Sequence, residues 1–118
     1  MSFTEYNLYP NVLRNLGNQF KYKDGWEIIP QYRGRTGYRP DFVIQRKNRG
    51  KIERVVVEVK AVKRISQRDI TQVHRYVRAL SGRNVKIVGR ILAVPAGTRT
   101  DLVPSNFRKM ILRSYHIV

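Results

Sequence analysis

One hairpin signal constrains this chain more than any other feature. Two apolar runs, Phe42-Val43-Ile44 and Val55-Val56-Val57, lie on either side of the turn-forming sequence Asn48-Arg49-Gly50. Phenylalanine, valine and isoleucine favour strands, and a short Gly-containing segment between two such runs is typical of a β-hairpin. The sequence therefore predicts one strand over 41–47 and a second over 52–60.

Helix and strand signals alternate along the rest of the chain. Ser66 with Asp69 three residues later resembles a capping box, and an apolar stripe follows, which predicts a helix over 66–81. A helix is also expected over 4–17, kinked at Pro10 or beginning near it. The remaining expectations are a short strand at 26–29, a basic loop at 32–38, a strand at 85–94 interrupted near Gly89, a short helix around 106–110 and a final strand ending at 115–118. This order describes a single α/β domain over 1–118, with a central mixed sheet flanked by helices.

The charge of the chain points to a polyanionic partner. Lys and Arg number 24 against 8 Asp and Glu, for a formal net charge of +16 in 118 residues. Such a charge attracts nucleic acid and releases its counterions on binding, but a ribosomal-type or chromatin-type protein would show it too. No apolar run reaches about 18 residues, so we expect no membrane span. The absence of cysteine and of a secretory signal fits an intracellular protein, in the cytoplasm, the nucleoid or the nucleus.

Acids are scarce, so the few at strand positions are informative. Asp41 opens the first predicted strand of the hairpin, while Glu58 and Lys60 close the second on the same side. Carboxylates from neighbouring strands can converge on one hard divalent cation, which would hold a phosphate. The backbone carbonyl of Val59 could add a ligand, and Lys60 could orient an attacking water or stabilise negative charge. We call the end of the hairpin away from the turn, where Asp41, Glu58 and Lys60 lie, the base of the hairpin. It is predicted to hold a divalent metal ion against a phosphate.

These residues also resemble a known motif. Pro40-Asp41 followed by Glu58-Val59-Lys60 resembles the signature of the PD-(D/E)XK nuclease superfamily, and Gln72-Val73-His74-Arg75-Tyr76 is similar to the QxxxY motif of its RecB-like branch. Tyr38-Arg39-Pro40-Asp41-Phe42-Val43 and Val56-Val57-Glu58-Val59-Lys60-Ala61-Val62 are similar to the small GxxExxY proteins. The resemblance implies a restriction-endonuclease-like αβββαβ core, Mg²⁺ or Mn²⁺ at the acids, and hydrolysis of DNA phosphodiester bonds.

The resemblance also implies supporting roles. Gln72 and Tyr76 would help to position the metal site or the nucleic-acid backbone, and Glu5 is the candidate for a further acid on the first helix. The expected catalytic residues are Asp41, Glu58, Lys60, Gln72 and Tyr76, and the expected metal ligands are Asp41, Glu58, Val59 and Glu5. Small members of the class often act as dimers, so a homodimer is expected.

Basic and aromatic residues flank the predicted site. They precede Asp41 and follow Lys60, where they could hold phosphates or stack on unpaired bases. The expected nucleic-acid-binding residues are Arg33, Arg35, Tyr38, Arg39, Lys63, Arg64 and Arg68. Two alternatives stay open, an inactive nucleic-acid-binding module of the same fold and a basic ribonucleoprotein component. Two acids and a lysine at this spacing favour a Mg²⁺-dependent deoxyribonuclease over both.

Overall fold

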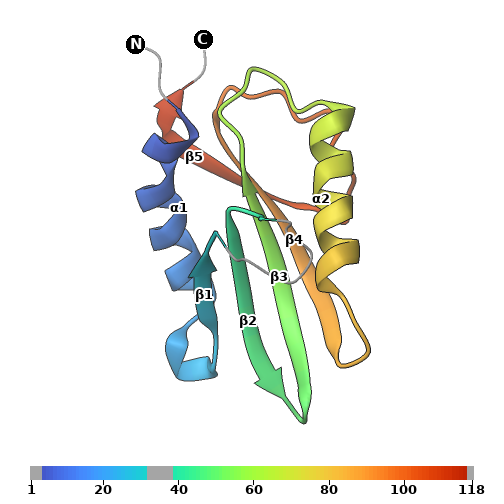
Figure 1. Cartoon of the computed structure of the whole chain (residues 1–118). Coiled ribbons are helices and arrows are strands. Elements are labelled where there is room, and N and C mark those ends of the chain that lie inside the picture. Colours follow the sequence, from blue (N-terminus) through green and yellow to red (C-terminus); the bar gives the residue numbers. More distant parts are fainter. Residues whose placement is uncertain (1–3, 32–38, 117–118) are drawn as a thin grey trace.

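One five-stranded sheet with two helices forms the fold (Figure 1). The computed structural model describes residues 4–31 and 39–116. The elements are α1 (Glu5–Gln19), the 3₁₀ turn η1 (Tyr22–Asp24), β1 (Glu27–Pro30), β2 (Phe42–Asn48), β3 (Lys51–Val59), α2 (Gln67–Leu80), β4 (Val85–Ala96) and β5 (Arg108–His116). Within the described ranges, no helix is long and apolar enough to cross a membrane.

The sheet is mixed, as the sequence predicts. Its strands lie in chain order, with β1, β2 and β3 antiparallel and with β3, β4 and β5 parallel. Parallel neighbours need a crossover, and α2 supplies it between β3 and β4. This α/β arrangement agrees with the predicted restriction-endonuclease-like core.

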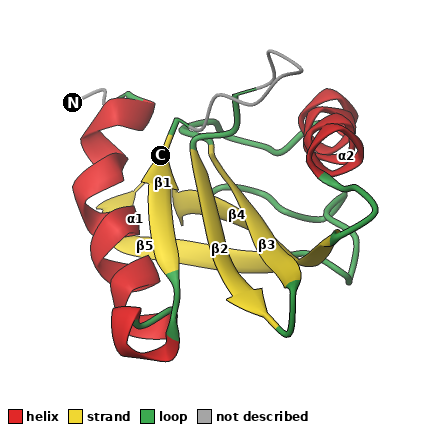
Figure 2. Ribbon diagram, turned by 60° about the horizontal axis from the view of Figure 1, so that its bottom comes forward, coloured by secondary structure: helices red, strands yellow, loops and turns green. Residues whose placement is uncertain are grey.

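The two helices cover opposite faces of the sheet, and β3 faces both of them (Figures 1 and 2). Val55, Val57 and Val59 pack in the core layer of α1, whereas Val56 packs in the core layer of α2. The alternation predicted for this strand is therefore confirmed. It directs the side chain of Glu58, two residues after Val56, toward the layer of α2.

The hairpin turn agrees with the prediction to within one residue at each strand end. Asn48 pairs with Lys51, and the two residues between them, Arg49 and Gly50, have φ angles of 52° and 79°. Two successive positive φ values are what a two-residue type I′ turn requires, and that turn matches the twist of the strands it joins. The turn sets the register that brings the base of the hairpin together.

The helix expected over 4–17 is confirmed, but the alternative that it begins near Pro10 is wrong. It begins at Glu5 and is capped by Thr4, whose backbone amide donates to Asn7 Oδ1 at 2.7 Å. Pro10 is tolerated because it lies on the exposed side of α1, where water can reach the carbonyl freed one turn earlier. No helix forms around 106–110, since β5 starts at Arg108 and pairs with β4. Strand pairing there outweighs the local helical pattern.

The predicted break near Gly89 is a bulge inside a continuous β4. The pairing of β3 with β4 shifts between Arg54 and Val55, where Ile87 and then Gly89 are the partners. A Cβ atom at Gly89 would lie 3.4 Å from the Cγ atoms of Val55. Glycine therefore lets the two strands approach closely at the bulge.

Candidate active site

The two predicted acids lie side by side where β2 begins and β3 ends. The ladder pairs Phe42 with Val57, so Asp41 is opposite Glu58. The backbone amide of Asp41 donates to Glu58 Oε1 at 3.2 Å, and the amide of Val59 donates to Asp41 Oδ2 at 2.7 Å. Each carboxylate is thus held by the backbone of the neighbouring strand.

Glu58 occupies an unusual environment for a carboxylate. With 4% of its surface exposed, it is the one buried charged residue among those the structure describes. Burial raises the pKa of Glu58 to about 9, and the neighbouring Asp41 adds to this rise, while the charge of Lys60 opposes it. Lys60 is the cation that lies nearest to Glu58 in the described residues, at 4.0 Å, so the buried acid pair favours the binding of a further cation or of a proton.

Lys60 joins the acids to α2. Its Nζ donates to Gln72 Oε1 at 3.0 Å and lies 3.7 Å from Asp69 Oδ1 and 4.0 Å from Glu58 Oε2. Gln72 Nε2 in turn donates to the hydroxyl of Tyr76 at 2.8 Å. The predicted pair on α2 is therefore one hydrogen-bonded unit that orients the ammonium group.

Tyr76 is the buried end of this hydrogen-bonded network. It is 7% exposed, and burial, followed by the charges of Glu58 and Asp41, raises the pKa of its hydroxyl to about 12. The hydroxyl therefore stays protonated at neutral pH. Lys60, Gln72 and Tyr76 are brought together as the sequence predicts.

The sequence analysis missed two residues of the site, Tyr9 and Asp69. The hydroxyl of Tyr9, on α1, donates to Asp41 Oδ1, and its ring centroid lies 5.2 Å from that of Phe42. Burial and this hydrogen bond raise the pKa of Tyr9 well above its ordinary value. A helical spacing of four from Glu5 places Tyr9 on the same side of α1, which is a signal that sequence reasoning could have used.

Asp69 was predicted only as a capping residue. Its Oδ2 accepts from the amide of Ser66 at 2.9 Å, which confirms the capping box, while Oδ1 faces the ammonium group of Lys60. The N-terminal cap of α2 thus also contributes negative charge beside Lys60. Nothing in the sequence pattern reveals this second contact, because it depends on where the helix packs.

Glu5 lies at the margin of the site. Burial raises the pKa of Glu5, with the charge of Lys60 and the backbone amide of Ala61 opposing that rise. Over residues 4–31 and 39–116, no group of three His, Cys, Asp or Glu side chains is placed to hold a metal ion. Asp41 and Glu58 are the pair that the fold assembles, and ligation by Glu5 or by the Val59 carbonyl stays a prediction.

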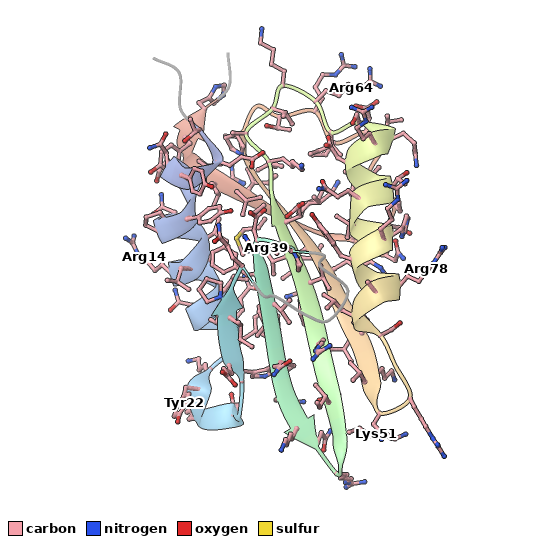
Figure 3. The ribbon with its side chains drawn as sticks, in the orientation of Figure 1. Arg14, Tyr22, Arg39, Lys51, Arg64 and Arg78 are labelled. Carbon is pink, nitrogen blue, oxygen red and sulfur yellow. The ribbon has the colours of Figure 1, made fainter. Side chains whose placement is uncertain are left out.

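The predicted nucleic-acid contacts are only partly described. Arg33, Arg35 and Tyr38 lie outside the described residues. Arg39, Lys63, Arg64 and Arg68 are exposed, and Figure 3 places Arg39 between the two helices and Arg64 near the N-terminus of α2. Arg64 forms an ion pair with Asp101 at 2.8 Å, which offsets part of its charge.

A groove runs from Lys60 along one flank of α2. Its volume is about 840 Å³, and it is lined by Lys60, Gln67, Arg68, Asp69, Thr71, Gln72 and Arg75. Arg75, which the sequence analysis did not single out, lies two turns after Arg68 on this flank. The groove joins the assembled lysine network to exposed arginines, an arrangement that suits a phosphate chain.

The sequence of the chain matches the model of a known protein family. A family model of the PD-(D/E)XK nuclease superfamily matches residues 8–90, a stretch that contains Asp41, Glu58 and Lys60. No curated protein and no solved structure matches the chain. The matched region covers most of the chain and includes the hairpin, α2 and the first half of β4. The chain therefore belongs to the PD-(D/E)XK nuclease superfamily.

Proposed function

We propose that this protein is a metal-dependent nuclease that hydrolyses DNA phosphodiester bonds. The observation that carries the proposal is the pairing of Asp41 with Glu58, next to a Lys60 that is oriented by Gln72. Membership of the PD-(D/E)XK superfamily supports hydrolysis of nucleic acid. The hydrogen-bonded Gln72 and Tyr76 also favour the RecB-like branch.

The donor set fits Mg²⁺ or Mn²⁺. Carboxylate oxygens are the ligands that hard divalent cations prefer, and nucleases of this superfamily typically use such ions. The oxygens Oδ1 and Oδ2 of Asp41 and Oε1 of Glu58 each accept a hydrogen bond from the protein, and each retains a further lone pair for an ion. A divalent cation would also supply this buried pair with more positive charge than Lys60 alone provides.

Each residue of the site would have its own role in hydrolysis. Asp41 and Glu58 would hold the ion, which neutralises charge on the phosphate and activates water. Lys60, fixed by Gln72, would orient the attacking water and stabilise negative charge as it develops. Tyr76 would keep Gln72 in place, and Tyr9 would keep the Asp41 carboxylate in one orientation. Glu5 and the Val59 carbonyl are candidates for completing the ligand set.

The exposed basic residues around the site would hold the substrate backbone. Arg39 lies two residues before Asp41, Lys63 and Arg64 lie between Lys60 and the start of α2, and Arg68 lies in the first turn of α2. Arg33, Arg35 and Tyr38 belong to the same proposal through their positions in the sequence. A homodimer and an intracellular location complete the proposal.

The test is cleavage of labelled single-stranded, double-stranded and junction DNA in Mg²⁺ or Mn²⁺ against EDTA. Wild type would be compared with Asp41→Ala and with Asp24→Ala, a control acid that is exposed on η1. We expect metal-dependent cleavage that Asp41→Ala abolishes and Asp24→Ala retains. Tight DNA binding without cleavage would instead identify an inactive binding module. Binding to RNA alone, without any effect of Asp41→Ala, would identify a ribonucleoprotein component.

A further inference from the structure

An exposed tyrosine contacts Tyr9, the residue whose hydroxyl donates to Asp41. Tyr6, on α1, is 69% exposed. Its ring centroid is 5.3 Å from that of Tyr9, whose hydroxyl donates to Asp41 and whose ring also contacts Phe42. Tyr6 is therefore the outer end of a row of aromatic rings that starts at the base of the hairpin.

An exposed ring at this place has a use that a buried one does not. Tyr9 and Phe42 are accounted for by packing and by the hydrogen bond to Asp41, whereas most of the surface of Tyr6 remains open to a ligand. Every nucleobase has a π-face that can stack on an aromatic ring, and this contact is tolerant of sequence. Bases inside a duplex are already stacked on one another, so only an unpaired base can be offered to Tyr6.

The other side of the site carries charge instead of aromatic surface. The groove along α2 begins at Lys60 and contains Arg68 and Arg75. Seven residues apart on a helix, these arginines have their Cα atoms about 10.5 Å apart along the axis, so they can contact different phosphates of one strand. The groove begins at Lys60, next to Glu58, and Tyr6 reaches Asp41 through Tyr9, so both adjoin the same acid pair. A basic groove together with an aromatic platform is the arrangement that binds single strands.

We propose that the site accepts a strand whose bases are unpaired beside the scissile phosphate. One base stacks on Tyr6, and Arg68 and Arg75 hold the phosphates that follow along α2. The inference rests on the proposed nuclease function and names its substrate class, which is single-stranded DNA or a single-stranded segment of a flap, gap or opened junction.

The test measures binding in EDTA, where cleavage cannot interfere. Fluorescence anisotropy would give the affinity of wild type, Tyr6→Ala, Tyr6→Phe and Tyr22→Ala for a labelled single-stranded oligonucleotide and for its duplex. Tyr22 is the matched control, since it is 88% exposed and follows the C-terminal end of α1, whereas Tyr6 lies at the N-terminal end (Figure 3). Thermal melting of each variant would verify that it folds.

We expect Tyr6→Ala to weaken single-strand binding by roughly 5- to 100-fold while leaving duplex binding almost unchanged. Tyr6→Phe, which keeps the ring, and Tyr22→Ala should bind both as wild type does. Unchanged single-strand affinity in Tyr6→Ala, or an equal loss for both DNA forms, would overturn the inference. Cleavage by wild type in Mg²⁺ separates the two proposals. Cleavage that is insensitive to Tyr6→Ala removes only this inference, whereas binding that depends on Tyr6 without any cleavage removes the nuclease function.

Discussion

The two ends of the β2–β3 hairpin place the same type of side chain in opposite environments. Near the turn, Arg46 Nε donates to Glu53 Oε1 at 2.7 Å, and the guanidinium group lies 4.4 Å from the ring centroid of Trp26. The hydrogen bond from Arg46 lowers the pKa of Glu53. At the base, Glu58 is buried against Asp41, and burial raises its pKa. The Glu53 carboxylate is paired with a cation at 2.7 Å, whereas Glu58 has Lys60 only at 4.0 Å and keeps a proton at neutral pH.

Glu53 has a structural partner in Arg46, whereas Glu58 is the acid that we expect to act in catalysis. Both acids lie on β3, but only Glu58 is at the end of the strand, two residues before Lys60. The half-buried Glu53 carboxylate is already satisfied by its charged hydrogen bond with Arg46, so it needs no further cation. A buried carboxylate beside a second carboxylate is costly unless a proton or a cation joins it, and such perturbed groups mark functional sites.

The largest expected difference between the two ends is in catalysis. Glu58→Gln and Asp41→Asn each remove the charge of one expected metal ligand while keeping the shape of the side chain. Each should lower the rate of Mg²⁺-dependent DNA cleavage by roughly 10³-fold, since the loss of charge stabilisation by the ion is worth several kcal/mol. Single-turnover cleavage rates would measure this. Glu53→Gln, the same change near the turn, should cleave at the wild-type rate, and a comparable loss there would contradict the comparison.

A second difference concerns stability against pH. Between pH 4.5 and about 9, the folded chain keeps a proton on Glu58 that the unfolded chain has released. The contribution of Glu58 to the free energy of unfolding is therefore complete below pH 4.5 and is lost as the pH rises toward 9. Urea unfolding of the metal-free protein across this window should show the decrease, and saturating Mg²⁺ should reduce it.

The variants at the two ends test the origin of that decrease. Glu58→Gln should remove most of it, because the amide does not titrate, and the raised pKa of Glu5 accounts for the remainder. Glu53→Gln should keep it, because the lowered pKa of Glu53 acts below pH 4.5. An unchanged pH dependence in Glu58→Gln would assign the effect to another group.

A smaller effect is expected from the contact that α1 makes with the base of the hairpin. Tyr9→Phe removes the hydroxyl that donates to Asp41. Loss of a group that orients a ligand typically weakens metal binding or activity by about 10-fold or more, and loss of the hydrogen bond should cost about 1 kcal/mol of stability. Titration of cleavage with Mg²⁺ would measure the first and urea unfolding the second.

Tyr115→Phe is the control for Tyr9→Phe. The Tyr115 hydroxyl also donates to α1, to the carbonyl of Asn7 at 2.9 Å. This control should lose stability without a change in the Mg²⁺ concentration needed for half-maximal cleavage. Equal Mg²⁺ requirements for Tyr9→Phe and wild type would show that Tyr9 has only a packing role.

The smallest expected effect is at the turn itself. Arg49 has a φ of 52°, a conformation that asparagine adopts more readily than arginine. Arg49→Asn should therefore stabilise the protein by roughly 0.5 kcal/mol without altering cleavage. Urea midpoints would measure this, with Lys51→Gln as a control that removes one charge outside the two positive-φ positions. Destabilisation by Arg49→Asn would indicate that the arginine side chain itself supports the turn.

The sequence by itself determined the hairpin, the alternation along β3 and the meeting of Asp41 with Glu58. These features follow from strand periodicity and from a two-residue turn, which are local and act through the register of one pair of strands. The capping box of α2 and the spacing of Gln72 and Tyr76 are local in the same way. Lys60 follows from the same alternation, since it lies two residues after Glu58.

Only the tertiary structure decided what surrounds that hairpin base. Tyr9 reaches Asp41 across 32 positions of the chain, and Asp69 reaches Lys60 because of the way α2 packs. The segment from Arg108 is a strand because β4 offers it a partner, and α1 continues through Pro10 because that side of the helix faces water. A local sequence pattern does not predict such contacts, since their free energy arises from the packing of separate helices and strands.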